Sequence, residues 1–455
     1  MSEKIQLFNT LGKEKQEFIP LNKGQVRMYS CGPTVYSYIH IGNHRHNLVD
    51  DFLKRMFLFN KYEVIHIINI TDVGHLTSDA DEGEDKMEKA ARKEQKSPLE
   101  IAEYYTQSFF DDLAQLNIIP ATQYPRATAY IAEQIEMIKE LEKKGYTYHA
   151  GGNVYFDTEK FPEYGSLTNK QHTEAYSRTG KDPNKKNSQD FVLWFTKSKY
   201  EHHAQVWDSP WGTGYPGWHI ECSTMSRKLL GDQFDIHTGG VDLQPVHHEN
   251  EIAQSNCAIG KRAVNYWVHN EFLVVGKEKM AKSSGGFLTL ANLKKEGFDP
   301  LDFRYLCLLT HYRKQLQYST EALVSARNAV KNIRKRLSTL PKENKTADAA
   351  SIAKFRTLIN DDLNLPQAVA LLQEVLQEGS ENAYATILEM DKVFGLCLDK
   401  EEQLAIPQEV RELLNKRTIA RKEKNWKESD TLRDLILAKG YKILDSSTGT
   451  TVEKI

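Results

Sequence analysis

Cysteine is scarce in this chain, and neither a long hydrophobic run nor an excess of charge stands out. Five cysteines in 455 residues are few and odd in number, which argues against a disulfide scaffold and favours a reducing compartment. No stretch approaches the roughly 18 apolar residues of a membrane span, and the N-terminus lacks the apolar core of a signal peptide. We therefore expect a cytoplasmic protein without a membrane partner.

The charge balance limits how this protein could contact nucleic acid. With 60 basic and 62 acidic residues, the formal net charge is −2, so RNA contact requires local basic patches. Hydrophobic content of 40% is normal for a globular protein, and the length predicts two to four domains. We find no internal repeat and no low-complexity tract.

Apolar patterning in the first third of the chain predicts an α/β domain. Residues 26–30 are typical of a strand, 31–33 break it, and a helix is predicted from near residue 42. The apolar run 64–70 suits a buried parallel strand. A strand, helix and strand in this order predict a doubly wound, Rossmann-like parallel sheet.

Further elements follow from caps and periodicity. Ser97 and Glu100 form a capping box that opens a long helix. A hairpin is predicted around 153–157, and the polar segment 181–187 reads as part of an insertion. The α/β pattern resumes at 218–220 and 234–237, and a last strand is predicted over 267–275. Beyond residue 318 the spacing is helical, with a linker at 341–345 and a short strand at 441–444.

Two short strings could handle a nucleotide. In the first, His40, Gly42 and Asn43 begin a predicted helix, whose free N–H groups and positive dipole end attract phosphate. In the second, Lys279 and Lys282 lie on a Gly/Ser-rich loop and could stabilise a leaving pyrophosphate. Taken alone, each string is more often an ordinary turn or a solvated basic loop. Their joint occurrence, each after a predicted strand, favours the functional interpretation.

Scattered sulfur, imidazole and carboxylate groups suggest a metal site. Cys31, Cys222, His247 and Glu251 are ligand types that zinc prefers. His247 and Glu251 are four residues apart and would share one helix face, but His248 would serve almost as well, and spacing does not choose between them. Single cysteines are weaker evidence than a paired motif, so buried free thiols are the alternative.

The strings as a set resemble the class I aminoacyl-tRNA synthetases, and in particular the cysteinyl-tRNA synthetase family. The resemblance runs nearly end to end and is carried by residues 31–36, 69–72, 217–223, 247–255, 362–368 and 424–430. The lysine loop departs from the family pattern at Ala281, Ser284 and Gly286.

The resemblance implies specific roles for residues of this chain. It places the zinc ligands on Cys31, Cys222, His247 and Glu251, and the amino-acid pocket on Trp218 and Asp242, with Thr71 and more loosely His237. It implies ATP with Mg²⁺, L-cysteine and tRNA(Cys) as reactants, one zinc ion per chain, and a monomer in preference to an oligomer. Zinc would read the substrate thiol, because an apolar pocket separates near-isosteres by only about 10²-fold.

The resemblance also gives domain boundaries. It predicts a catalytic domain over 1–125 and 205–290, a connective insertion over 126–204 and a junction over 291–319. A helical bundle that binds the anticodon stem is expected over 320–403, and a small anticodon-binding domain over 404–455. In the last of these, Arg417, Arg421, Lys424 and Trp426 suit phosphate contact and base stacking.

Two other functions remain open at this point. A cysteine ligase acting on an amino-sugar would reuse the adenylation site, but it would not need the helical half beyond residue 320. A non-catalytic paralogue that binds RNA or senses cysteine would not need both lysines and all four ligands.

Overall fold

The computed structural model describes residues 4–74, 86–168, 182–196, 205–276, 278–279, 288–400, 407–446 and 449–454. The chain divides into two compact units, 1–396 and 397–455, and each is described by itself. No helix among the described residues is long and apolar enough to cross a membrane.

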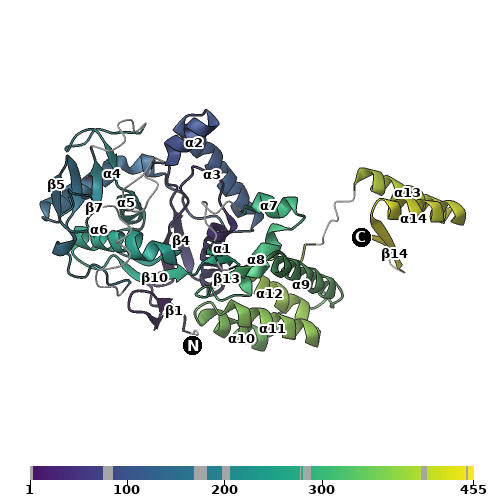
Figure 1. Ribbon diagram of the computed structural model, residues 1–455. Coiled ribbons are helices and arrows are strands. Elements are labelled where there is room, and N and C mark those ends of the chain that lie inside the picture. The colour runs from purple at the N-terminus through teal and green to yellow at the C-terminus, as the bar shows by residue number, and fades with distance from the viewer. Residues whose placement is uncertain are drawn as a thin grey trace. The chain divides into compact units, whose positions relative to one another are not determined.

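A parallel sheet of four strands forms the centre of the first unit (Figure 1). The strands are β3 (Gln25–Ser30), β4 (Glu63–Ile68), β9 (Phe234–Gly240) and β10 (Val264–Asn270), in the order β10-β9-β3-β4. Helix α1 (Ile41–Phe59) joins β3 to β4, and α6 (Glu249–Ile259) joins β9 to β10. The two crossovers leave the centre in opposite directions. Because such crossovers are right-handed, α1 and α6 cover opposite faces, and the predicted doubly wound sheet is confirmed.

Helix α1 is buried on nearly every side. His40 caps its N-terminus, and the predicted apolar stripe of Leu48, Phe52, Met56 and Phe59 is buried. Polar residues of the helix are buried as well, because α1 packs against the sheet and also against helices α8 (Pro300–Leu308) and α12 (Ala383–Phe394). This helix therefore connects the sheet to the C-terminal helices.

An antiparallel sheet of four strands has three of its strands inside the predicted insertion, 126–204, and the fourth beyond its predicted end. They are β5 (Thr147–Ala150), β6 (Asn153–Phe156), β7 (Phe191–Phe195) and β8 (Tyr215–Pro216). The expected hairpin is β5–β6, turning at Gly151 and Gly152, both at positive φ. The helices before and after this sheet are α2 (Lys86–Glu94), α3 (Pro98–Gln115), α4 (Ile131–Lys143) and α5 (Trp218–Leu230). The Ser97 capping box of α3 is confirmed.

The single strand predicted over 267–275 is wrong. The segment forms β10 and then β11 (Leu273–Val275), which belongs to another sheet with β12 (Glu278–Lys279) and β13 (Leu316–Tyr318). The break falls where backbone groups turn to partners outside the first sheet. The Glu271 N–H donates to the Tyr312 carbonyl, and the Arg45 guanidinium donates to the carbonyls of Glu271 and Phe272.

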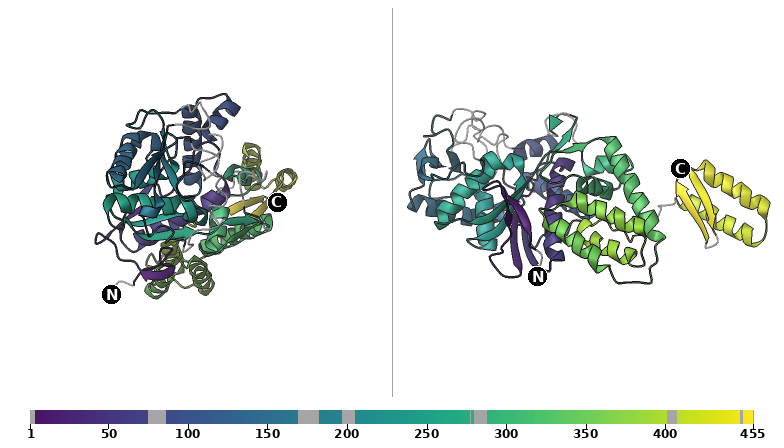
Figure 2. Two further views of the ribbon diagram at one scale, coloured as in Figure 1. Left: turned by 60° about the vertical axis from the view of Figure 1, so that its left-hand side comes forward. Right: turned by 90° about the horizontal axis from the view of Figure 1, so that it is seen from below.

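Helices make up most of the remaining described chain of the first unit (Figure 2). After α7 (Leu290–Lys295) and α8 come α9 (Thr320–Ser338), α10 (Ala349–Asn360), α11 (Leu365–Glu378) and α12. The predicted helical region and the linker at 341–345 are confirmed. A hairpin of β1 (Gln6–Asn9) and β2 (Glu14–Glu17) begins the unit.

The second unit is a helical hairpin followed by a strand hairpin. Its elements are α13 (Gln408–Lys422), α14 (Trp426–Ala438), β14 (Tyr441–Ser446) and β15 (Gly449–Lys454). Arg417 is only 5% exposed and donates to both carboxylate oxygens of Asp445, at 3.1 and 2.8 Å. Arg421 also pairs with Asp445. The expectation that Arg417 is available to RNA is wrong, whereas Trp426 is 59% exposed.

Candidate metal and nucleotide site

The candidate site lies where the direction of winding reverses, between β3 and β9. Cys31 follows the last residue of β3, and its N–H donates to the carbonyl of Thr238 on β9. In open α/β sheets the crevice at the carboxyl ends of strands at such a point is the usual ligand site. Cys31 and the nucleotide-binding string follow β3, whereas His247 and Glu251 follow β9.

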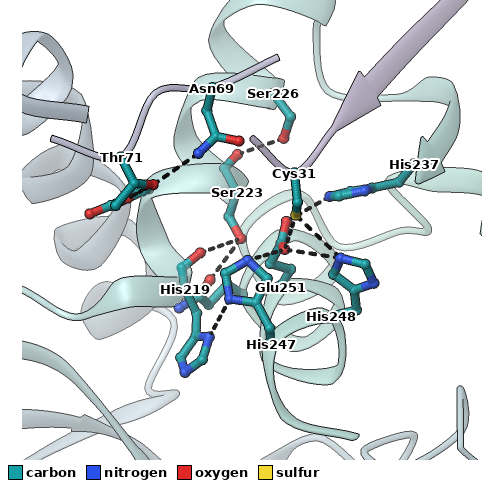
Figure 3. Close-up of polar contacts among 12 residues, drawn as sticks. Cys31, Asn69, Thr71, His219, Ser223, Ser226, His237, His247, His248 and Glu251 are labelled. Atoms are coloured by element: carbon teal, nitrogen blue, oxygen red, sulfur yellow. Dashed lines mark hydrogen bonds and ion pairs between the residues drawn. The ribbon is translucent and has the colours of Figure 1, made fainter. Parts of the chain in front are cut away.

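The four predicted ligands are together. One ligand atom each from Cys31, Cys222, His247 and Glu251 lies within 4.8 Å of the other three. Nε2 of His247 is 2.9 Å from Oε1 of Glu251, and Sγ of Cys31 is 3.9 Å from the same oxygen (Figure 3). Among the described residues a second set, Cys31, His237, His248 and Glu251, meets the same geometric criterion. The cluster thus fits a metal site of mixed sulfur, nitrogen and oxygen donors.

Local backbone structure produces this convergence. A turn of π-helix, η5 (Gln244–His248), runs into α6, so that His247 and Glu251 face the same side. His248 points toward the end of β9, where Gly239 leaves room for its ring. A Cβ atom at Gly239 would come within 2.3 Å of the His248 Cε1. Glycine at this position therefore allows a second imidazole to approach Cys31, whose Sγ is 3.3 Å from His248 Nε2.

Protons are shared unequally within the cluster, because burial raises the pKa of Cys31 well above its ordinary value, whereas neighbouring groups oppose the effect of burial at the other three ligands. A hydrogen bond from Cys31 lowers the pKa of Cys222 to about 7 against the effect of burial, and His247 contributes to the lowering. Burial alone would raise the pKa of Glu251, but His237 and His247 lower it to about 2. Burial likewise opposes the charge on His247, yet Glu251 and Cys222 raise its pKa to about 10. A metal cation would replace the protons that now balance these groups.

A layer of histidines surrounds the ligands. Nε2 of His237 is 2.9 Å from Oε2 of Glu251, and Nδ1 of His219 is 2.9 Å from Nδ1 of His247. On the other side, Nδ1 of His248 is 2.7 Å from Nε2 of His269. Sequence reasoning missed His219 and His269, because nothing in their spacing links them to the ligands.

The residues predicted to line an amino-acid pocket have different environments. The Trp218 ring lies 4.4 Å from the His247 ring, and His237 is buried behind Glu251. Thr71 is buried and donates to Glu221, the residue before Cys222. Asp242 is exposed on the short helix η4 (Val241–Leu243). Trp218, His237 and Thr71 thus adjoin the cluster, and Asp242 lies on the turn that leads to η5.

The nucleotide-binding string has the geometry of a helix N-terminus. His40 is the N-cap of α1, and its Nδ1 accepts from the Asn43 N–H at 3.1 Å. The first turn of α1 contains no acidic residue, so the positive end of the helix dipole is not offset there. Gly42 packs directly against His40, since a Cβ atom at this position would lie 2.9 Å from the imidazole Nδ1.

The lysine string begins next to this helix. Strand β12 pairs Lys279 with Val274 of β11. Where the chain returns, the Leu288 carbonyl accepts from the Ile41 N–H at 2.9 Å, and Thr289 forms a bridge with His40. The side chain of Lys279 and all of Lys282 lie outside the described residues. Leu273 of β11 lies beside Gly42, so the described residues on either side of the lysine segment adjoin the start of α1.

Comparisons with known proteins agree with this architecture. Residues 17–328 match the family model described as the tRNA synthetases class I (C) catalytic domain. A solved methionyl-tRNA synthetase of Mycobacterium tuberculosis in complex with methionyl-adenylate has a TM-score of 0.56 at 16% identity, covering 82% of this chain and 90% of that one. A putative arginyl-tRNA synthetase from Campylobacter jejuni has a TM-score of 0.52 at 13% identity, covering 83% and 93%. The fold is that of a class I aminoacyl-tRNA synthetase.

Curated relatives match over their whole length. A cysteine–tRNA ligase of Treponema denticola is 44% identical, with 99% of this chain and 100% of the relative covered. Cysteine–tRNA ligase 1 of Burkholderia lata is 43% identical, with 98% and 96% covered. A cysteine–tRNA ligase of Borrelia turicatae is 38% identical, with 99% of both covered. This chain belongs to the cysteine–tRNA ligase family.

Proposed function

We propose that this protein is a cysteine–tRNA ligase that reads its amino acid through sulfur. ATP and L-cysteine form cysteinyl-adenylate and pyrophosphate, and the activated carboxyl then moves to a ribose hydroxyl at the 3′ end of tRNA(Cys). The observation that carries the proposal is the meeting of two thiols, an imidazole and a carboxylate at the carboxyl ends of β3 and β9. The full-length relatives support the same activity.

We propose that zinc occupies the Cys31, Cys222, His247 and Glu251 set. Two thiolates favour zinc over harder cations, and this set contains two sulfurs where the alternative set contains one. When bound, zinc supplies an affinity for thiolate that distinguishes cysteine from serine. His237 holds the second oxygen of Glu251, which fixes the orientation of the carboxylate.

The remaining steps rest on protein groups around ATP. His40, Gly42 and Asn43 hold the nucleotide at the positive end of α1, and Mg²⁺ accompanies ATP. Lys279 and Lys282 stabilise the pyrophosphate as its charge grows. The substrate carboxylate is already a nucleophile, so no side chain acts as a general base.

The amino-acid and RNA contacts complete the proposal. Trp218 and Asp242, with Thr71 and His237, line the cysteine pocket. The helices α9–α12 receive the tRNA stem, and the second unit contacts the anticodon with Trp426, whose ring is free to stack on a base. The five free cysteines suit action in the cytoplasm.

Cysteine-dependent exchange of pyrophosphate into ATP tests the first half-reaction, and charging of tRNA(Cys) tests the second. We expect both, with serine supporting exchange at least about 10³-fold less well, beyond what an apolar pocket achieves. Exchange without charging would point to another acceptor, such as an amino-sugar. Binding without exchange would refute an enzyme.

A further inference from the structure

Arg45 is a buried arginine whose role the reaction scheme leaves open. It lies on α1 two residues after Asn43, the last residue of the nucleotide-binding string, and is only 1% exposed. Its guanidinium contacts backbone carbonyls of two segments far apart in the sequence. Nη1 donates to Glu271 at 2.6 Å and Phe272 at 2.5 Å, and Nη2 donates to Lys314 at 2.5 Å, with longer contacts of 3.5 and 3.4 Å to His311 and Tyr312.

A buried charge of this kind is costly unless its hydrogen bonds perform a task. Burial lowers the pKa of Arg45, but a guanidinium stays protonated in proteins. An apolar side chain could fill the same space without desolvating a charge. What only arginine provides is a planar fork that grips several carbonyls at once. We therefore infer that a buried arginine occupies this position because its guanidinium can bind the carbonyls of Glu271, Phe272 and Lys314 together.

That backbone is the base of the lysine segment. Phe272 directly precedes β11, which pairs with the strand that carries Lys279. The Phe272 carbonyl also accepts from the Leu316 N–H at 2.9 Å, so Arg45 fixes β11 together with β13. On the return side, Ile41 holds the Leu288 carbonyl. The first two turns of α1 thus hydrogen-bond the backbone on both sides of the lysine segment, through Arg45 before it and Ile41 after it.

We propose that Arg45 is a positioning residue for ATP activation. It sets β11, which pairs with the strand of Lys279, against the end of α1 that binds the nucleotide, and so positions the backbone of Lys279 for ATP activation. The proposal rests on the proposed function and adds to it a part for a residue outside both nucleotide strings. It does not require Arg45 to touch substrate.

The test compares Arg45→Lys and Arg45→Gln with the wild type in cysteine-dependent pyrophosphate exchange. A shift of about 1 Å in a reacting group costs on the order of 10²-fold. We expect kcat to fall roughly 10- to 100-fold in Arg45→Lys and at least as far in Arg45→Gln, because lysine keeps the charge and loses the fork. The KM for cysteine and the bound metal should stay within about twofold of wild type, since the metal cluster is untouched.

Arg304→Lys is the matched control. Arg304 is also fully buried and also donates to backbone carbonyls, at 2.6 Å to Phe394 and 2.8 Å to Leu116, and it forms in addition an ion pair with the buried Asp51 of α1. It faces α12 instead of the lysine segment. Arg304→Lys should reduce thermal stability at least as much as Arg45→Lys, because it also disturbs the ion pair with Asp51, while leaving the kcat of exchange nearly unchanged. Equal kcat losses in both variants would show a general stability effect and overturn the proposal.

A measurement on the wild type covers the case in which the Arg45 variants do not fold. The amides of Glu271 and Leu316 should exchange as slowly in the free protein as those of β10, with no further slowing by ATP. Protection that arises only with ATP would overturn the proposal. Absence of cysteine-dependent exchange in the wild type would instead refute the proposed function, so the two failures are distinguishable.

Discussion

Asp362 gives the sharpest quantitative test of how the helical bundle is attached. Its side chain is 1% exposed, and four donors surround its carboxylate. Oδ1 accepts from the Phe8 N–H at 2.8 Å and from the Tyr312 hydroxyl at 2.5 Å. Oδ2 accepts from Nε of Arg313 at 2.8 Å and lies 2.7 Å from Nη2. The residue therefore fastens the loop between α10 and α11 to β1 and to the segment after α8.

The Asp362→Asn substitution removes one half of this arrangement. Asparagine tolerates the positive φ of 59° and keeps an oxygen for Phe8 and Tyr312, but it presents an NH₂ group to Arg313. Breaking a buried ion pair costs about 3–5 kcal/mol. Because the Arg313 side chain is 36% exposed and can be hydrated, we expect about 2–3 kcal/mol. This loss should appear as easier local opening at the junction.

Hydrogen exchange of the Phe8 and Asp362 amides measures that opening. A loss of about 2–3 kcal/mol raises their exchange rates roughly 30- to 150-fold, since about 1.4 kcal/mol corresponds to a factor of ten. The control is Asp361→Asn, one residue earlier, where an exposed pair with Lys15 is worth about 0–1 kcal/mol. Equal rate changes in the two variants, or no change for Asp362→Asn, would refute the reasoning.

Three further predictions concern the metal, pH and RNA. Cys222→Ser should lose bound zinc and raise the KM for cysteine at least about 10- to 100-fold while ATP still binds. The control variant Cys257→Ser should keep the metal. An equal loss of ATP binding in Cys222→Ser would show that the metal is structural. Burial, with Asp299 nearby, raises the pKa of Asp302 to about 6, so its contribution to stability is full below about pH 4 and lost as pH rises through 6. The free energy of unfolding of Asp302→Asn, measured by urea titration, should therefore exceed that of wild type by about 1–3 kcal/mol at pH 8, and the gain should shrink at pH 5; a gain independent of pH would contradict this cause. Trp426→Ala should weaken tRNA charging through KM and leave cysteine-dependent exchange and stability unchanged, and a loss of exchange would show that its role is not RNA contact.

Local sequence signals predicted the elements whose stability is local. The Ser97 capping box is confirmed because the groups that satisfy it lie three residues apart. The helical stripe over 323–337 is confirmed because every third or fourth residue packs into the bundle. The strand predicted over 267–275 runs past the end of β10 at Asn270. The groups that end β10, Arg45 and Tyr312, come from distant parts of the chain, so local sequence does not predict where it stops.

The same distinction applies to the site. Residue types near Cys31 and Cys222 suggested metal chemistry, but the spacing of His247 and His248 left the imidazole ligand open. In the structure the His248 ring lies next to Cys31 and the His247 ring lies next to Glu251. This arrangement depends on the π-helical turn before α6 and on Gly239, which leaves room for the His248 ring. In the second unit, Arg417 is a residue type that often contacts RNA phosphates. Its carboxylate partner, Asp445, lies 28 residues later, so the local sequence around Arg417 does not reveal the ion pair.

The bond from Phe8 to Asp362 has a consequence for how the chain is made. Its two ends are 354 residues apart. At roughly 5–20 residues per second, about 20–70 s of ribosomal synthesis separate the first end from the second. The N-terminal strand must wait through that interval without its final partner, so its closure is among the late events of folding.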